Sequence, residues 1–233
     1  MRELLLAGKR RVRDVWLVDG TDPAPILDDI VELATEARVT IKRVSRDQLE
    51  HAARSDAPQG VLAHAQPLPE ADLDTLARSR DGRVPFLVAL DSVTDPQNLG
   101  ALLRTAECAG ATGVVLPRHR SAHVTPTVAK AAAGAVEHLP IALVGGLPSA
   151  LARLKELGVW TVGLDAAGDQ SVFDLAVATE PVALVLGAEG RGLSRLVRDR
   201  CDVLASIPLR GALASLNVSA AGAIACYEIA RRR

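Results

Sequence analysis

Hydrophobic and polar positions along residues 1–66 follow a pattern that predicts a small α/β unit. Apolar residues recur at helical spacing from about Ile26 to Ala37, and shorter helical patterns occupy Glu3–Ala7 and the stretch RDQLEHAAR. Between them lie the strand-like runs VWLV, TIKRV and GVLAHA. The chain from residue 67 to residue 84 is rich in proline and charge, as linkers are, so we expect a domain boundary there.

A second, longer α/β series runs from residue 85 to residue 233. Its strand-like runs are FLVAL, GVVLP, IALV, WTVGL, VALVLG and VLASIPL, and its helical runs are NLGALLRTAECAG, TPTVAKAAAGAVEHL, PSALARLKELG and NVSAAGAIACYEIARRR. Strands that are apolar throughout and separated by helices predict a parallel sheet covered on both faces. Because such sheets bind ligands at the carboxyl ends of their strands, we expect the functional residues in the loops that follow the strands.

The composition narrows the class of protein. The chain of 233 residues is 48% hydrophobic but only 2% aromatic, so an aliphatic core is expected, and its net charge of −1 gives no overall attraction to nucleic acid. No apolar run reaches the roughly 18 residues of a membrane span, and the N-terminus does not resemble a secretory signal. Cys108, Cys201 and Cys226 lie far apart without metal-ligand spacing, which favours free thiols in a cytoplasmic protein without a metal.

The first unusual loop lies in the stretch LDSVTDPQNLGALLRTAECAGATG, Leu90–Gly113. Asn98 follows a turn at Asp95 and Pro96 and is well placed to cap the helix that begins there. Arg104 lies within the otherwise Ala- and Leu-rich helix. An isolated arginine on an apolar helix often only extends its charge to solvent, so Arg104 alone is a weak indication of function.

The second loop is LVLGAEGRGLS, Leu184–Ser194, which reads as a strand, a turn with three glycines and the start of a helix. The glycine spacing, Gly187-x-x-Gly190-x-Gly192, differs from the G-x-G-x-x-G of dinucleotide-binding proteins, and no Lys-Ser/Thr pair follows as in a Walker loop. Glu189 would repel a phosphate, and its carboxylate suits a cation, a hydroxyl or an amine instead. A dinucleotide-dependent enzyme on a doubly wound sheet is therefore the disfavoured alternative.

The third loop lies in SIPLRGALASLNVSAAGAIA, Ser206–Ala225. Either Ser215 or Asn217 is placed to cap the helix that follows. The many small residues of that helix allow its backbone to pack closely against another segment. Each of the three loops is a weak signal alone, whereas their order and spacing together form a specific pattern.

Taken in order, TDPQNLGALLRTAECAG, LVLGAEGRGLS and IPLRGALASLNVSAAGAIA resemble the three motifs of the SpoU/TrmH family, the RNA ribose 2′-O-methyltransferases of the SPOUT class. The resemblance implies an α/β SPOUT fold, a parallel sheet with a deep C-terminal trefoil knot, which is an exception to the rule against threaded chains. Residues 1–66 resemble the L30e-like RNA substrate-binding domain of the rRNA branch, residues 67–84 then form a linker, and residues 85–233 form the catalytic domain.

The resemblance also implies the cofactor, the substrate and the oligomer. S-adenosyl-L-methionine is the expected methyl donor, and the expected acceptor is the 2′-hydroxyl of a guanosine in 23S rRNA, since the tRNA branch generally lacks the front domain. A homodimer is expected, with the last helix contributing to the subunit interface. The alternatives are a tRNA 2′-O-methyltransferase and a non-catalytic rRNA-binding assembly factor on the same fold.

Matching the family's motifs residue by residue gives the expected site. The residues expected at the reacting hydroxyl are Arg104, Asn98, Glu189, Ser215 and Asn217. Of these, Arg104 is expected either to accept the proton of the hydroxyl or to stay charged and hold an RNA phosphate. The residues expected around the cofactor are Leu186, Gly187, Gly192, Ile207, Leu209 and Leu216. The residues expected on RNA phosphates are Arg10, Arg11, Arg13, Arg118 and Arg120.

Overall fold

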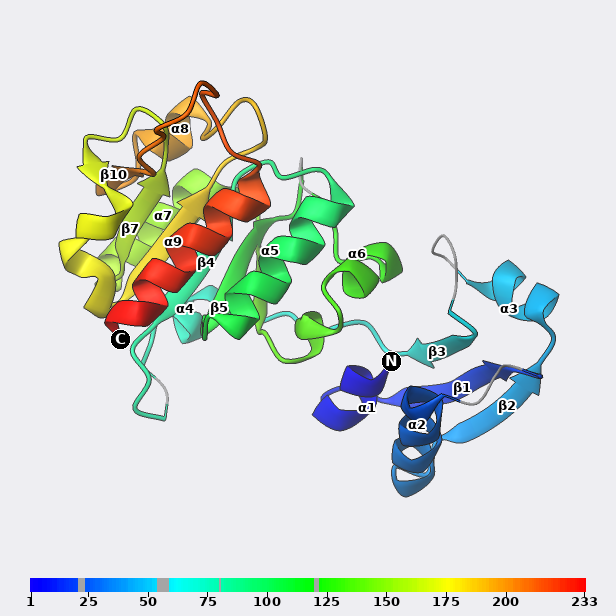
Figure 1. The fold of residues 1–233 in the computed structure, drawn as a ribbon. Helices are drawn as coiled ribbons and strands as arrows, with labels where there is room; N and C mark the ends of the chain where they lie inside the picture. The colour runs from blue at the N-terminus through cyan, green and yellow to red at the C-terminus, as the bar shows by residue number, and fades with distance from the viewer. Residues whose placement is uncertain (21–23, 54–58, 80, 120–121) are drawn as a thin grey trace.

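A computed structural model describes residues 1–20, 24–53, 59–79, 81–119 and 122–233 of the chain. It consists of a smaller and a larger α/β unit that lie side by side (Figure 1). The elements of the smaller unit are α1 (Arg2–Ala7), β1 (Val12–Val18), α2 (Pro25–Glu36), β2 (Thr40–Val44), α3 (Arg46–Ala52) and β3 (Val61–Ala65). These are the helices and strands that the hydrophobic pattern of residues 1–66 predicts, with β1 beginning three residues earlier than its apolar run.

The smaller unit is built on a three-stranded sheet with the order β2-β1-β3. Strand β1 pairs in parallel with β2 and antiparallel with β3. Its side chains alternate between the two faces, and Val15 and Leu17 join Ile30 and Ala34 of α2 in a compact aliphatic core. Helices α2 and α3 lie on opposite sides of this sheet (Figure 1).

The larger unit contains a seven-stranded sheet with the order β6-β5-β4-β9-β7-β10-β8. All of its strand pairs are parallel. Its strands are β4 (Phe86–Leu90), β5 (Gly113–Pro117), β6 (Ile141–Val144), β7 (Trp160–Leu164), β8 (Gln170–Ser171), β9 (Val182–Leu186) and β10 (Val203–Ser206). Its helices are α4 (Leu73–Leu76), α5 (Pro96–Cys108), α6 (Pro126–Ala131), α7 (Leu147–Glu156), α8 (Arg195–Arg198) and α9 (Val218–Arg232), with short 3₁₀ helices η1 (Ala135–Glu137), η2 (Val172–Asp174) and η3 (Ala176–Thr179).

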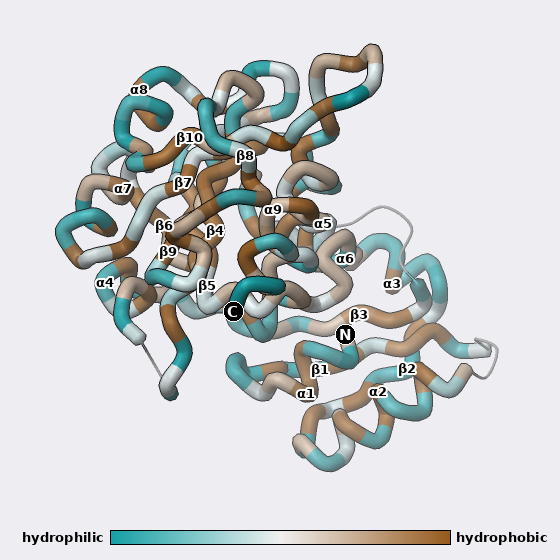
Figure 2. The backbone as a smooth tube through the Cα atoms, turned by 60° about the vertical axis from the view of Figure 1, so that its left-hand side comes forward, coloured by the Kyte–Doolittle hydropathy of each residue, from teal (hydrophilic) through white to brown (hydrophobic). Residues whose placement is uncertain are grey.

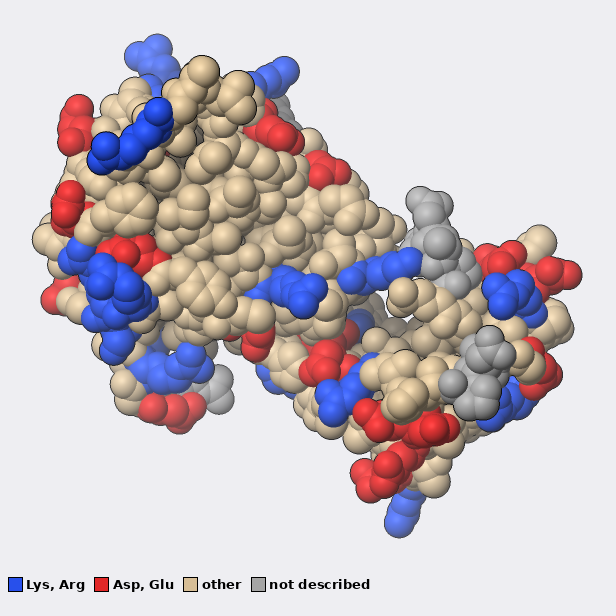
Figure 3. Space-filling view, in the orientation of Figure 1, with Lys and Arg blue, Asp and Glu red and all other residues tan. Residues whose placement is uncertain are grey.

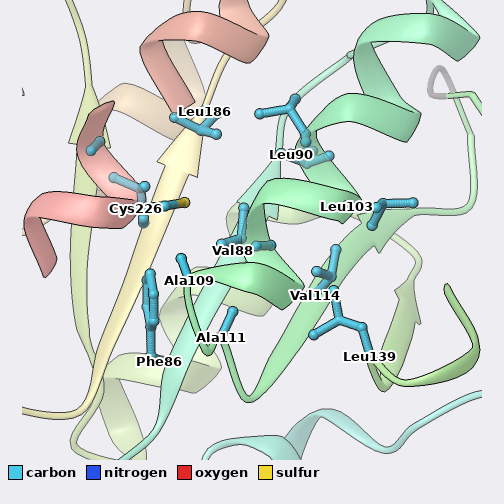
Figure 4. Packing of buried hydrophobic residues seen from close by; sticks show 14 of the residues in the cluster. Phe86, Val88, Leu90, Leu103, Ala109, Ala111, Val114, Leu139, Leu186 and Cys226 are labelled. Atoms are coloured by element: carbon cyan, nitrogen blue, oxygen red, sulfur yellow. The ribbon is translucent and has the colours of Figure 1, made fainter. Parts of the chain in front are cut away.

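Both faces of the large sheet are covered by helices, as the apolar strands predict. Every residue of β4 is buried, with Phe86, Val88 and Leu90 on the side of α5 and α9 (Figure 4) and the residues between them on the side of α7. The strands form a brown band of hydrophobic residues inside the unit in Figure 2, whereas the helices are mixed in colour. Because all strand pairs of this sheet are parallel, the carboxyl ends of the strands lie at one shared edge.

The segment 67–84, expected as a linker, packs against the larger unit. Glu70 forms an isolated parallel bridge with Ile141, and the backbone N–H of Ala71 donates to the carbonyl of Ile141 over 2.8 Å. Leu76 of α4 is only 8% exposed and belongs to the core beneath α7. The segment thus extends the larger unit at its β6 edge.

The stretch 125–139, predicted as one helix, is interrupted, and that prediction is wrong. Helix α6 ends at Ala131, and Ala133 and Gly134 adopt positive φ angles of 50° and 88° before η1 begins. A Cβ atom at Gly134 would lie 2.7 Å from the Cβ of Glu3, so the turn packs directly against α1 of the smaller unit. The close approach between the two units requires the glycine.

Polar contacts at this turn join the two units. Arg10 donates to both carboxylate oxygens of Glu137, over 2.9 and 2.5 Å, and the side chain of Glu137 is only 5% exposed. Next to this pair, Nε2 of His138 lies 2.8 Å from a carboxylate oxygen of Glu3. Hydrogen bonding to His138 lowers the pKa of Glu3 below its ordinary value.

Candidate functional site

Three loops meet at the carboxyl end of the large sheet, after β4, β9 and β10. Asp91, the first residue after β4, is 6% exposed and ties the first two loops together. Its backbone N–H donates to the carbonyl of Leu186 over 2.7 Å, and its Oδ2 accepts from the backbone N–H of Ser194 over 2.7 Å. The sequence reasoning missed Asp91, although a carboxylate directly after a fully apolar strand is a recognisable signal.

A side-chain network joins all three loops. Nδ2 of Asn98 donates to Oε2 of Glu189 over 3.0 Å. Nδ2 of Asn217 donates to Oδ1 of Asn98 over 3.0 Å and to Oε1 of Glu189 over 3.4 Å. The structure thus brings together three of the five residues expected at the reacting hydroxyl.

The helix caps explain why these side chains are available. Asp95 caps α5 by accepting from the backbone N–H of Asn98 over 2.8 Å, so the prediction that Asn98 itself is the cap is wrong. Asp95 precedes a proline at the first helical position and has extended backbone angles. Asn98 therefore lies inside the first turn, and its carboxamide is not used for capping. Asn217 caps α9 through Oδ1, which accepts from the backbone N–H of Ser219 over 2.8 Å.

The glycine loop closes on itself directly after β9. Ala188 and Gly192 form an antiparallel bridge in which the N–H of Gly192 donates to the carbonyl of Ala188 over 2.9 Å. A Cβ atom at Gly187 would lie 2.1 Å from the carbonyl carbon of Gly192, and Gly190 and Gly192 have φ angles of 75° and 65°. The unusual glycine spacing therefore serves a tight turn that presents Glu189 at its tip.

Arg104 and Ser215 are exposed and lie outside the hydrogen-bonded network. Arg104 is on α5, two turns beyond Asn98, and it makes no hydrogen bond or ion pair with any residue that the structure describes. Ser215 lies in the loop before α9 and likewise has no such partner within the described ranges. Both side chains are free to meet a ligand.

The expected cofactor residues differ in burial, and Ile207 is half-buried and packs against the core of the larger unit. Leu186 ends β9 and is 1% exposed, and Gly187 directly after it is buried. Leu209 and Leu216, on the loop before α9, are 40% and 41% exposed, and Leu213 between them is 81% exposed. Leu213 lies within the third motif but was not among the residues expected at the cofactor. This loop presents uncovered leucines next to the residues of the network.

The expected RNA-binding arginines have different surroundings. Arg10 is paired with Glu137 at the contact between the units, and Arg118 donates through both terminal nitrogens to the carboxylate of Glu70. Arg13 is 71% exposed beside Asp14, and Arg11 is exposed. Arg120 lies outside the described residues. Arg11, Arg13 and Arg118 are all exposed, and of these Arg118 is paired with Glu70 and Arg13 with Asp14.

The cysteines are free, as expected from their spacing. Burial raises the pKa of the Cys201 thiol and of the Cys226 thiol to about 12, so both stay protonated at neutral pH. Among the described residues, no group of three or more His, Cys, Asp and Glu side chains is arranged to hold a metal ion. The helices in the described ranges are also too short or too polar to cross a membrane.

Comparison with known proteins gives matches over both units. A family model described as the SpoU rRNA methylase family matches residues 85–227, and one described as RNA 2′-O ribose methyltransferase substrate binding matches residues 2–71. The chain is 40% identical over 233 residues to the 23S rRNA (guanosine-2′-O-)-methyltransferase RlmB of Pseudomonas syringae pv. tomato, with 99% of this chain and 92% of the relative covered.

Solved structures agree in fold. The SpoU methyltransferase AviRb from Streptomyces viridochromogenes superposes with a TM-score of 0.82 and 28% identity, covering 99% of this chain and 85% of AviRb. Its complex with the cofactor AdoMet gives a TM-score of 0.80 at 26% identity, covering 98% of this chain and 86% of AviRb. A solved structure whose description refers to the 2-OH methylation of C/U34 on tRNA superposes with a TM-score of 0.57 and 27% identity. The match covers 64% of this chain and 96% of the chain in that structure.

A substrate-binding unit joined to a parallel sheet with this three-loop site defines a two-domain RNA methyltransferase of the α/β SPOUT type. The chain belongs to the SpoU rRNA methylase family. These matches confirm three expectations drawn from the order of the three motifs: the family, the enzyme class and an adenosylmethionine cofactor.

Proposed function

We propose that this protein transfers a methyl group from S-adenosyl-L-methionine to the ribose 2′-hydroxyl of a guanosine in 23S rRNA. The observation that carries the proposal is the Asn98–Glu189–Asn217 network, because it joins the three motif-bearing loops at the ligand-binding edge of the sheet. Support for rRNA comes from the nearly full-length match to the RlmB relative, whereas the tRNA-modifying structure covers 64% of the chain. A ribosomal RNA substrate also fits the cytoplasmic location expected from the sequence.

The residues present fit the cofactor. Leu209, Leu213 and Leu216 expose apolar side chains on one loop, which suits an adenine ring, and the carboxylate of Glu189 suits the positively charged methionine part. The residues that would hold the cofactor are Leu186, Gly187, Gly192, Ile207, Leu209 and Leu216. When bound, adenosylmethionine supplies an electrophilic methyl carbon.

Arg104 carries the chemistry at the acceptor. The 2′-hydroxyl has to lose its proton as the new bond forms, and a guanidinium normally stays protonated in a protein. Because Arg104 is exposed and unpaired among the described residues, we assign it as a charged clamp that holds the RNA phosphate and stabilises negative charge on the 2′-oxygen, while the proton of the hydroxyl passes to solvent water. Asn98, Glu189 and Asn217 hold the surrounding loops, and Ser215 lies beside them on the loop before α9.

The active form proposed is a homodimer. Ile224 and Tyr227 lie on the same side of α9 and are 36% and 52% exposed. The surface over α9 and the adjoining part of α5 carries few charged side chains (Figure 3). A largely uncharged face beside Arg104 fits a subunit interface that borders the active site.

The test is methyl transfer to defined RNAs. Purified protein, labelled adenosylmethionine and deproteinised 23S rRNA should give label at a single guanosine, and bulk tRNA should give none. Deletion of the gene should remove one 2′-O-methyl mark from 23S rRNA in the source organism. Label in tRNA would overturn the assignment of the substrate, and binding of 23S rRNA without any label would favour the non-catalytic assembly factor.

A further inference from the structure

The smaller unit has a pocket on the face of its sheet opposite the aliphatic core. Because side chains alternate along β1, Trp16 lies on the face opposite Val15 and Leu17. Helix α3 packs on β1, on the opposite side of the sheet from α2 (Figure 1). A pocket of about 680 Å³, here called the Trp16 pocket, is lined by Trp16, Val44, Asp47, Gln48, His51 and Ala52. The pocket is broad and open to solvent, and Asp47, Gln48 and His51 in its lining are exposed.

Trp16 has an unmet hydrogen-bonding group. Its indole Nε1 is buried and has no hydrogen-bond partner within the described residues. Buried N–H groups without an acceptor are rare in folded proteins, so the buried indole N–H marks an unusual environment for Trp16. The ring is itself held in place, with the His64 ring packed edge-on at 5.1 Å between centroids and Nζ of Lys42 over the ring at 5.8 Å from its centre.

The charge of Lys42 lies next to the Trp16 ring, and Lys42 is held there by Asp14. Asp14, which is 3% exposed, accepts from Lys42 over 3.2 Å and from Arg13 over 3.3 Å, and its other oxygen lies 2.6 Å from Nδ1 of His64. The side chains of Lys42 and Arg13 are still 50% and 71% exposed. The ammonium group of Lys42 over the Trp16 ring suits a nucleotide, whose base stacks while its phosphate meets the cation.

The polar groups of the pocket favour one base. The carboxylate of Asp47 accepts no hydrogen bond from the part of the chain that the structure describes, and Gln48 uses only Oε1, which accepts from the N–H of Ser45 over 3.1 Å. Guanine carries two neighbouring donors, N1–H and N2–H₂, which match one carboxylate. Its acceptors O6 and N7 match an N–H donor such as Gln48 Nε2.

We propose that the Trp16 pocket binds an unpaired guanine of the RNA substrate, stacked on Trp16 and held at its donor edge by Asp47. The proposal rests on the proposed function to the extent that the substrate is RNA. An unstacked base is the part of an RNA that proteins read in single-stranded loops and bulges. The pocket therefore gives the smaller unit a means of choosing the RNA segment that the larger unit methylates.

The chain offers a direct reporter, since it has two tryptophans and the other is Trp160 on β7. In the full-length Trp160→Phe variant, Trp16 is the single source of indole fluorescence. Titration with the pentanucleotide UUGUU should quench this fluorescence, and UUAUU should bind about tenfold more weakly, as expected for one lost two-point base contact. Equal affinities for the two RNAs, or no quenching by UUGUU, would overturn the proposal.

Two further variants on α3 provide the matched comparison. Adding Asp47→Asn removes the carboxylate while keeping its shape, and should abolish the preference for UUGUU. Adding Glu50→Gln removes an exposed carboxylate of the same helix that does not line the pocket, and should leave the preference unchanged. A preference that survives in Asp47→Asn contradicts the assigned contact.

Methylation kinetics separate this proposal from the proposed function. In a chain that methylates 23S rRNA, Asp47→Asn should raise KM for the RNA about tenfold and leave kcat unchanged, because the pocket binds and does not react. An unchanged KM would refute the pocket and leave the methyltransferase intact. Absence of methyl transfer by the unmodified chain, with guanine-dependent quenching of Trp16 retained, would refute the proposed function alone.

Discussion

The two polar atoms of the Asn217 carboxamide make different contacts. Its oxygen caps α9, and its nitrogen donates to Asn98 and Glu189 on the two other loops. A cap is a local feature that sequence predicts, whereas the second half of the side chain gains a role only when the loops meet. The same residue thus fixes where the last helix begins and how that helix is joined to the site.

Arg104 is the residue on which the proposed chemistry depends. Arg104→Ala should lower kcat at least about 100-fold, because it removes the charge that meets the phosphate and the developing negative oxygen. The dissociation constant for adenosylmethionine, measured by calorimetry, should stay within about twofold. Arg195→Ala on α8, whose side chain is 93% exposed, is the matched control and should keep full activity. Near-normal turnover of Arg104→Ala would remove this residue from the mechanism.

At the scale of elements, the glycine loop shows how backbone packing restricts the sequence. Gly187 leaves no room for a side chain, since the carbonyl carbon and oxygen of Gly192 would lie 2.1 and 2.2 Å from a Cβ atom. These neighbours are backbone atoms and cannot rotate away. The loop therefore keeps its shape only with glycine at this position.

Gly187→Ala should disturb the loop and with it the site. We expect a loss of about 1–3 kcal/mol in the free energy of unfolding, as for other overpacked positions, and a much weaker affinity for adenosylmethionine. Gly211→Ala is the control, because a Cβ there meets nothing within 4 Å and its φ is not positive. Denaturant unfolding and calorimetry measure the two effects, and unchanged values for Gly187→Ala would contradict the close approach.

The end of α9 carries an acid-sensitive ion pair. Glu228 accepts from Arg231 and Arg232, over 2.9 and 2.7 Å at Oε1, and hydrogen bonding to these arginines lowers the pKa of Glu228 from 4.5 to about 2. Because the folded-state pKa is lowered, the stabilisation is present above pH 4.5 and is lost as the pH falls toward 2.

Glu228→Gln should therefore have a lower Tm than the unmodified chain at pH 6, and the two values should converge as the pH approaches 2. Differential scanning calorimetry across this range measures the effect. A Tm difference that stays constant from pH 6 to pH 2 would show that the charge of Glu228 contributes nothing to stability.

At the scale of the molecule, the two layers of the large unit differ in what they expose. The layer of α5 and α9 has a largely uncharged face with Ile224 and Tyr227, whereas α8 on the other layer exposes an isolated leucine, Leu196, at 68%. An exposed apolar face of this kind is covered in an oligomer, and an isolated leucine needs no explanation.

Ile224→Asp should convert the proposed dimer to a monomer, because it places a charge in the interface, and methylation should fall with it. Sedimentation velocity at micromolar concentration measures the state of association. Leu196→Asp changes a still more exposed apolar residue on the other layer, 68% against 36% for Ile224, and should leave the dimer intact. A monomeric unmodified chain would refute the homodimer.

Much of the fold could be predicted from the sequence because its signals are local. The apolar strands of the large unit occur where the pattern places them. The two-residue β8, the short helices α4 and α8 and the 3₁₀ helices η2 and η3 were not predicted, since they are too short for a periodic signal. The interruption between α6 and η1 was not predicted because the turn at Gly134 packs against α1, which is distant in sequence.

The sequence by itself determined the alternation of helices and strands, the glycine turn after β9 and the set of residues proposed to carry the chemistry. Only the tertiary structure decided which of them meet. Asn98 and Glu189 are 91 residues apart and Asn98 and Asn217 are 119 apart, yet each pair is joined by a hydrogen bond. The tertiary structure also paired Arg10 with Glu137 and left Trp16 beside a pocket. The physical reason is that periodicity and capping act over one or two turns, whereas the meeting of loops depends on the packing of the whole sheet.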